Sequence, residues 1–219
     1  SRRETSQVAR LAAPPTVSRL ATTLMRSAMA IFIPLRLQAS GLPVAEATAR
    51  LGMLNGMVLP IIMLPCVFTS ALAMVTLPRV SQADQDAARL RGLIRRVLGS
   101  AAGVGAACAA LTYAFAPFLA EAVYRLPELT ALFRAASPLV LLSACNHALT
   151  GVIAGLGKQK QGMLASLCAA MLALLLTWWL TALPGLRLYG ALLAMAAETA
   201  LLAAWNLGIL WQTLRALKR

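Results

Sequence analysis

Long apolar stretches alternate with short polar segments along the chain. Two of the apolar stretches, 11–39 and 188–214, carry a few charges. Four others contain no Asp, Glu, Lys or Arg at all, namely 51–78, 97–120, 135–157 and 161–186. Each is long enough to cross a bilayer, which takes roughly 20 apolar residues. The pattern predicts six transmembrane helices, at about 12–38, 51–77, 94–116, 132–156, 163–183 and 188–213.

The polar segments between these stretches carry turn residues. A Ser-Gly-Leu-Pro cluster begins at Ser40, and a glycine-flanked basic loop covers 155–162. Residues 78–93 are polar and basic with an amphipathic pattern, and Ser81 or Asp84 is a candidate helix cap. We therefore expect 1–219 to form one six-helix unit, with 78–93 as a cytoplasmic amphipathic linker inside it.

The composition excludes most other classes of protein. Hydrophobic residues make up 60% of the 219 residues and charged residues only 12%, with a mean hydropathy of +0.76. Soluble domains are about 45–50% apolar and about 25% charged. A soluble fold of this size would lack the polar surface to cover itself, and disordered, collagen-like and coiled-coil chains are excluded by the same numbers. An all-α, polytopic membrane protein remains.

The net charge of +13 is informative about topology. Of the 20 Lys and Arg residues, 13 lie in segments on the side of the N-terminus, 5 on the opposite side and 2 inside the first predicted span. Basic residues collect in cytoplasmic loops, so both termini are expected in the cytoplasm and the protein in the cell membrane. The basic excess needs no nucleic-acid partner to explain it.

Three charged residues within the spans are candidates for function. Arg19 and Arg26 lie seven residues apart, close to two helical turns, and so on one face of the first span. Their planar guanidinium groups suit phosphate, although Arg19 could instead reach the cytoplasmic interface. Glu198 is the one acidic residue within a span, and we interpret it either as a proton- or cation-coupling carboxylate or as the ion-pair partner of Arg26.

Other polar and proline residues in the spans carry weaker signals. Asn55, Asn146 and His147 are candidates for a polar cavity lining, with hydrogen bonding between helices as the alternative. Pro60 and Pro65 lie inside the second span, where proline removes a backbone hydrogen bond and bends the helix, as gating would need. The four cysteines lack metal-ligand spacing, and no motif of a soluble enzyme is present, so we expect no metal, no cofactor and no enzyme activity.

Several short motifs together resemble a known family of transporters. They are PTVSRL from Pro15, IPLRL from Ile33, LGMLNGM from Leu51, LPRVS from Leu77 and GVIAGLGK from Gly151. Their order resembles the C-terminal half of the stage V sporulation protein B branch of the polysaccharide exporters. These exporters belong to the multidrug/oligosaccharidyl-lipid/polysaccharide flippase superfamily, together with the lipid II flippases.

The resemblance implies a function and an architecture. Members of the superfamily have two six-helix lobes around a central cavity and move lipid-linked glycans by alternating access. Because this chain has one lobe's worth of helices and begins at Ser1, we expect an N-terminal lobe of the same protein or a second copy as partner. The implied substrate is an anionic lipid-linked glycan of cell-envelope or spore-cortex synthesis, met by Arg19 and Arg26 in the bilayer. Coupling to Na⁺ or H⁺ stays open.

Two alternatives to this hypothesis are kept. The first is a multidrug cation antiporter of the same superfamily, although an organic cation prefers a cavity rich in acids and aromatics. This chain has one acid within its spans and only 5% aromatic residues. The second is a non-transporting membrane scaffold for envelope assembly, which has no need of Arg26 and Glu198 at mid-depth.

Overall fold

The computed structural model describes the backbone of residues 2–82 and 87–216, and the side chains of 20–71, 80 and 88–216. Within these ranges the chain is almost entirely helical and contains no strand. Six segments are long and apolar enough to cross a membrane: Leu20–Ala39, Val44–Ala71, Ala88–Ala114, Leu129–Gly155, Gln159–Leu180 and Leu188–Ala216. The predicted all-α, six-span organisation is confirmed.

The helices follow the predicted spans closely and extend beyond several of them. The single-helix spans are α1 (Arg2–Ala39), α4 (Ala87–Ala114), α6 (Leu129–Gly155), α7 (Gln159–Leu180) and α8 (Leu188–Ala216). The second span combines α2 (Val44–Met53), the π-helical turn η1 (Leu54–Val58) and α3 (Leu59–Gln82). Two short elements, α5 (Ala116–Phe118) and the π-helical turn η2 (Leu119–Val123), precede α6.

The segment 78–93, predicted as a linker, is largely helix. Its first residues complete α3 and its last ones begin α4, while 83–86 lie outside the described residues. Val80 and Leu90 are fully buried in one hydrophobic cluster, so the amphipathic pattern continues the two spans. Extending the helices keeps their backbone groups hydrogen-bonded where the chain leaves the apolar layer.

Two of the predicted turns end helices in the same way. Gly41 (φ 93°) follows α1 and Gly157 (φ 70°) follows α6, both in the left-handed region that glycine enters without strain. At each turn the amide that follows the glycine donates a hydrogen bond to a carbonyl five residues earlier in the helix. Leu42 N–H donates to the Leu37 carbonyl, and Lys158 N–H donates to the Ile153 carbonyl. This is the Schellman arrangement, and it reverses the chain into the next span.

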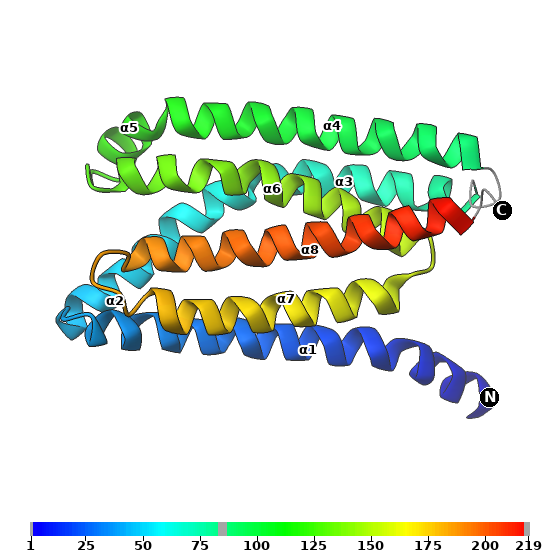
Figure 1. The fold of residues 1–219 in the computed structure, drawn as a ribbon, viewed down its shortest axis with the longest axis horizontal. Helices are drawn as coiled ribbons and strands as arrows, with labels where there is room; N and C mark the ends of the chain where they lie inside the picture. Colours follow the sequence, from blue (N-terminus) through cyan, green and yellow to red (C-terminus); the bar gives the residue numbers. More distant parts are fainter. Residues whose placement is uncertain (1, 83–86, 217–219) are drawn as a thin grey trace.

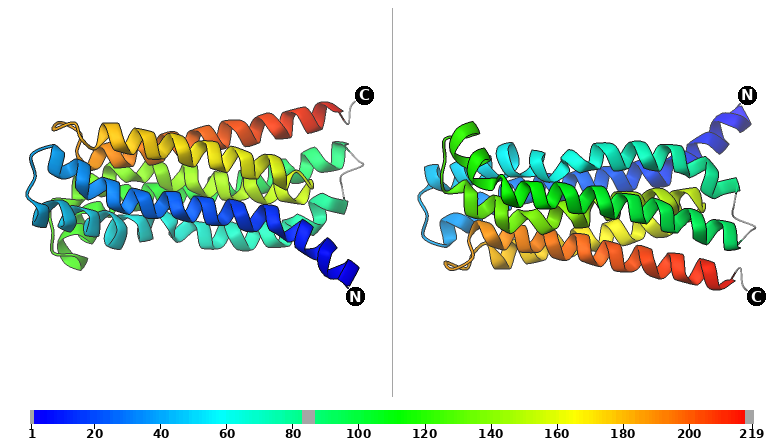
Figure 2. Two further views of the ribbon diagram at one scale, coloured as in Figure 1. Left: turned by 90° about the horizontal axis from the view of Figure 1, so that it is seen from below. Right: turned by 90° about the horizontal axis from the view of Figure 1, so that it is seen from above.

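The helices run side by side along one axis, with α6 between α4 and α8 (Figure 1). Across the bundle the order is α1, α7, α8, α6 and α4, each packed on the next, and α3 packs on both α6 and α4. In Figure 2, α1 lies in front when the bundle is seen from below and α4 lies in front when it is seen from above, so these two helices are on opposite sides of the bundle. The start of α1 and the end of α8 lie at one end of the bundle, which we call the terminal end, and the other is the far end.

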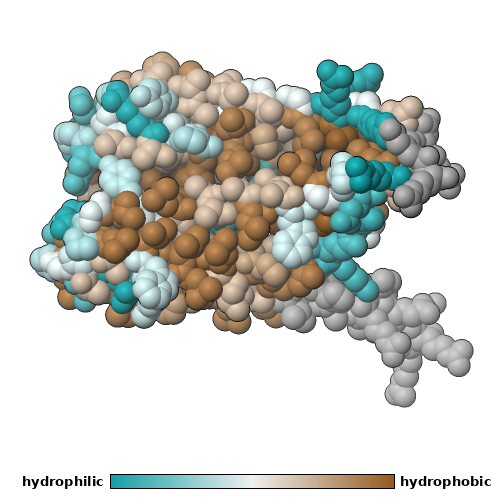
Figure 3. Space-filling view, viewed as in Figure 1, coloured by the Kyte–Doolittle hydropathy of each residue, from teal (hydrophilic) through white to brown (hydrophobic). Residues whose placement is uncertain are grey.

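The buried residues form two clusters, and α6 contributes to both. One cluster, towards the far end, includes Phe133 and Val140, and the other, towards the terminal end, includes Val152 and Ile153. The outer surface is apolar as well: Leu24 is 70% exposed and Trp179 71%. On the face in Figure 3, hydrophobic residues gather over the middle of the bundle and hydrophilic ones over its two ends. Such a band matches a surface in contact with lipid rather than water.

The second span changes its hydrogen-bond pattern just before its first proline. The Leu59 amide donates to the Leu54 carbonyl five residues back, which is a π-type bond. Pro60 follows directly and is exposed, while Pro65 is buried. Because proline supplies no amide hydrogen, this stretch of helix loses backbone bonds to the preceding turns. In Figure 1 the α2–α3 segment changes direction as it passes behind the bundle.

Candidate functional site

Three of the predicted site residues are brought within electrostatic range of one another. Arg26 lies on α1, His147 on α6 and Glu198 on α8. The charge of Arg26 acts on both His147 and Glu198. Arg26 and His147 are exposed on the described surface, while Glu198 is partly buried. The three residues come from helices far apart in the sequence, and no hydrogen bond or ion pair joins them among the described residues; we call them the Arg26 group.

This group lies deep in the apolar layer. At 1.5 Å per residue, Arg26 is about 20 Å from the end of α1 at Ala39, and Glu198 about 15 Å from the start of α8 at Leu188. Both depths fall near the middle of a hydrocarbon core that is about 30 Å thick. A charged side chain at that depth costs at least about 2.5–3.5 kcal/mol on insertion scales, so it faces protein or a water-filled cavity.

Arg26 and Glu198 attract each other without forming a direct ion pair. Among the described side chains, neither makes a salt bridge or a hydrogen bond to another residue. The guanidinium group therefore keeps its five donors for a ligand or for another part of an assembly. The carboxyl group of Glu198 lies within electrostatic range of the guanidinium and leaves its fork geometry open.

Asn146 fixes α6 to α8 next to this group. Its side-chain Nδ2 donates a hydrogen bond of 2.6 Å to the main-chain carbonyl of Thr199, the residue after Glu198. The Oδ1 atom of Asn146 is buried and has no partner among the described residues. His147 follows Asn146 on α6, and Glu198 precedes Thr199 on α8. The bond therefore places His147 and Glu198 at similar heights on the two helices.

The remaining predicted residues stand apart from the group. Asn55 is exposed in η1, and nothing among the described contacts joins it to Arg26, His147 or Glu198. Pro60 and Pro65 belong to the bend of the second span. Arg19 lies on α1, but its side chain is outside the described residues.

Two features were missed by the sequence analysis. Arg36 on α1 stacks on Trp178 of α7, 4.4 Å from the ring centroid, and its Nε donates a 2.8 Å hydrogen bond to the Trp178 carbonyl. The same ring meets Phe32 edge to face at 4.9 Å. An arginine close to a glycine turn hinted at an interfacial position, but nothing in the sequence indicated its partner on α7.

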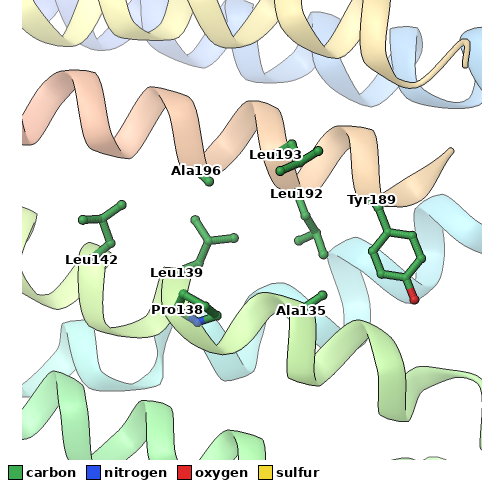
Figure 4. Close-up of a pocket in the computed structure, with 8 residues that line it drawn as sticks. All are labelled: Ala135, Pro138, Leu139, Leu142, Tyr189, Leu192, Leu193 and Ala196. Atoms are coloured by element: carbon green, nitrogen blue, oxygen red, sulfur yellow. The ribbon is translucent and has the colours of Figure 1, made fainter. Parts of the chain in front are cut away.

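The second missed feature is a pocket between α6 and α8 beside Pro138, a proline inside α6 (Figure 4). It holds about 390 Å³, and the side chains labelled in Figure 4 point into it from both helices. Its lining is Ala135, Pro138, Leu139, Leu142, Tyr189, Leu192, Leu193 and Ala196, without a charged residue. The pocket therefore suits an apolar group and not an anion.

The described residues hold no group of three or more His, Cys, Asp or Glu side chains that could bind a metal ion. The cysteines are free thiols: Cys66 is buried, Cys108 and Cys145 are partly buried, and Cys168 is exposed. The site consists of one guanidinium, one carboxyl and one imidazole group, supported by an interhelical amide.

Six helices long and apolar enough to cross a membrane define the class: the chain is an all-α, multi-pass membrane protein. Comparison with known proteins adds no family to this description, since no family model, no curated protein and no solved structure matches the chain.

Proposed function

We propose that this chain is one lobe of a membrane transporter that moves lipid-linked oligosaccharide or polysaccharide precursors across the cell membrane by alternating access. The observation that carries the proposal is Arg26, a guanidinium at mid-membrane depth that is exposed on the lobe and has no direct partner among the described residues. The resemblance of the PTVSRL, LPRVS and GLGK motifs to polysaccharide exporters supports it independently.

The proposed role of Arg26 is electrostatic. Phosphate groups of a lipid-linked glycan carry concentrated negative charge, and guanidinium binds phosphate in a bidentate, charge-assisted way. Glu198 and His147 lie within range of the same charge, so both set the strength of the field that a substrate meets. Glu198 is the candidate for H⁺ or Na⁺ coupling, because a proton or Na⁺ on its carboxyl group would change the charge within range of the guanidinium that binds the substrate.

The same exposure supports a two-lobe assembly. A charge at this depth does not face lipid, so the surface around Arg26 and His147 would be covered by an N-terminal lobe of the same protein or by a second copy. The substrate path would then run between the lobes. The bend of the second span at η1 and Pro60 supplies a segment with fewer backbone bonds, suited to a change in helix direction.

The test is transport by the full-length protein carrying Arg26→Ala or Arg26→Lys. We expect Arg26→Ala to abolish complementation of an exporter-deficient strain and flipping of a fluorescent lipid-linked glycan in proteoliposomes. Arg26→Lys keeps the charge but not the fork, and should retain partial activity. Arg50→Ala is the control, because Arg50 forms an exposed salt bridge with Glu46 one helical turn away. Undiminished transport by Arg26→Ala would remove Arg26 from the mechanism.

Glu198 favours a second candidate, a cation antiporter of the same superfamily. Its carboxyl group is partly buried, lies within a span and makes no ion pair among the described residues. Drug efflux that is lost in Glu198→Gln and kept in Arg26→Ala, with no effect on envelope polymers, would establish the antiporter in place of the exporter. Absence of both transport activities from the unmutated full-length protein would favour a scaffold.

The proposed orientation places both termini in the cytoplasm. The start of α1 and the end of α8 lie at one end of the bundle, as an even number of spans requires. Most Lys and Arg residues belong to the chain ends and loops that the sequence places on the same side as the N-terminus. The positive-inside rule then assigns the terminal end to the cytoplasm.

A further inference from the structure

A groove between α7 and α8 at the terminal end is distinct from the Arg26 group and from the apolar pocket of Figure 4. It holds about 350 Å³. Its lining is Gln161 and Leu164 from α7, and Trp205, Gly208, Ile209 and Gln212 from α8. Ile209 is buried and forms part of its floor, while Gln161, Leu164, Trp205 and Gln212 are exposed.

The lining changes from polar to apolar along the helices. The two glutamine amides lie nearest the terminal end, whereas Leu164 and Trp205 lie deeper towards the middle of the bundle. From Gln212 to Trp205 the groove runs about 10 Å along α8, at 1.5 Å per residue. Amides next to a tryptophan at the edge of the apolar band match the boundary between lipid headgroups and acyl chains.

Basic residues lie close in sequence to the polar end of the groove. Lys160 directly precedes Gln161, Lys158 lies three residues before Gln161, and Arg215 lies one helical turn beyond Gln212. The Arg215 guanidinium stacks on the ring of Trp211, 3.4 Å from its centroid, and Trp211 directly precedes the groove residue Gln212. Between 129 and 219 the only acidic residue is Glu198, which lies far deeper in the bundle. No carboxylate on α7 or α8 therefore neutralises this rim.

We propose that the groove binds one anionic phospholipid of the leaflet at the terminal end. The headgroup phosphate would meet Lys158, Lys160 and Arg215 together with the glutamine amides, and one acyl chain would lie along Leu164, Gly208 and Trp205. Basic pockets between transmembrane helices on the cytoplasmic side are suited to anionic headgroups. The apolar floor selects a lipid over a soluble phosphate, which would use the rim alone.

Gly208 leaves room for the acyl chain because it has no side chain. A Cβ atom built at Gly208 meets no atom within 4 Å, so a side chain there would extend into open space. Gly208→Leu therefore adds bulk to the groove from a Cβ atom that makes no close contact with the protein. Gly103 on α4 offers a control, because it is a helical glycine, exposed where Gly208 is partly buried, with nothing within 4 Å of an added Cβ.

The experiment measures lipid retained by the full-length chain, purified from nanodiscs that contain equal amounts of phosphatidylglycerol and phosphatidylcholine, by native mass spectrometry. We expect one phosphatidylglycerol bound in preference to phosphatidylcholine. Gly208→Leu should lose it and Gly103→Leu should keep it. Replacing Lys158, Lys160 and Arg215 by Gln should weaken retention on the order of a hundredfold, about fivefold for each charge removed.

Several results would overturn the inference. Equal retention by Gly208→Leu and Gly103→Leu would mean that the lipid lies elsewhere. Equal retention of phosphatidylcholine and phosphatidylglycerol would remove the role of the charges. Displacement by inorganic phosphate would show that only the basic rim binds. The experiment needs no transport, so its outcome is independent of the proposed transporter.

Discussion

Asn146 on α6 donates a 2.6 Å hydrogen bond from its side-chain amide to the main-chain carbonyl of Thr199 on α8. This bond ties together the two helices that carry His147 and Glu198. Helices in a bilayer lack a strong hydrophobic force between them, because lipid tails are as apolar as leucine. A polar link of this kind fixes the rotation and height of one helix against the other, and so positions the group around Arg26.

Replacing the amide should loosen this pair of helices. We expect Asn146→Ala to lower the free energy of unfolding by about 1 kcal/mol, between the average of about 0.6 kcal/mol and the maximum of about 1.7 kcal/mol for such bonds in membranes. Denaturation in mixed micelles, followed by circular dichroism, checks the value. Thr150→Ala is the control, since Thr150 is exposed one turn further along α6. Equal stability of the two variants would contradict the role given to Asn146.

The contact of Arg36 with Trp178 should hold the far ends of α1 and α7 together. Arg36→Ala removes both a cation–π contact and a charged hydrogen bond, so we expect a loss of about 1–2 kcal/mol in unfolding free energy. Arg36→Lys should restore only part, because an ammonium group lacks the planar fork.

The control for Arg36 is Arg50→Ala. Its exposed salt bridge with Glu46 has a length of 2.7 Å but should contribute no more than about 0.3–0.5 kcal/mol. A thermal shift assay on both alanine variants compares them directly. If Arg50→Ala destabilises the protein as much as Arg36→Ala, the aromatic contact contributes nothing specific.

Gly190 allows α8 to begin directly against the end of α7. A Cβ atom at Gly190 would lie 2.5 Å from the carbonyl oxygen of Leu180 and 2.9 Å from the amide nitrogen of Thr181. Both are backbone atoms that cannot rotate away, so Gly190→Ala should destabilise the protein by about 2–3 kcal/mol. Gly103→Ala meets nothing within 4 Å and should be neutral or stabilising by about 0.5–1 kcal/mol. The melting temperatures of the Gly190→Ala and Gly103→Ala variants test this prediction.

The surroundings of Arg26 are open to a direct test of solvent access. In full-length protein with Cys66, Cys108, Cys145 and Cys168 replaced by Ala, a cysteine is introduced by Arg26→Cys or by Leu24→Cys. Both positions are exposed on the lobe, Leu24 by 70%, but on different sides of α1. We expect a membrane-impermeant thiol reagent to label the first variant and not the second, because only a water-filled cavity supplies reactive thiolate. Labelling of Leu24→Cys alone would place Arg26 away from water.

Much of the fold follows from local properties of the chain. Hydropathy determines the six spans, because a bilayer admits a chain only as helices about 20 residues long or longer. The ends of α1 and α6 were predictable from Gly41 and Gly157, since the left-handed turns there need glycine. The segment 78–93 was harder, because an amphipathic pattern fits a surface linker as well as the ends of two long helices.

The candidate site was only partly predictable. Sequence alone placed Arg26 and Glu198 at similar depth, because depth depends on counting residues from a helix end. It left their mutual geometry open, since pairing depends on how each helix is rotated. The structure gives an electrostatic interaction without a direct ion pair, and it adds His147 to the same group while leaving Asn55 outside the described contacts.

By itself, then, the sequence determined the class of protein, the number of spans and the residues that lie at mid-depth, because these depend on composition and on distance along the chain. Tertiary structure decided which residues interact: Asn146 with the Thr199 carbonyl, Arg36 with Trp178, and the charge of Arg26 with His147 and Glu198. These interactions depend on how each helix is rotated and on the order in which the helices pack. Both are properties of the assembled bundle, to which residues far apart in the chain contribute together.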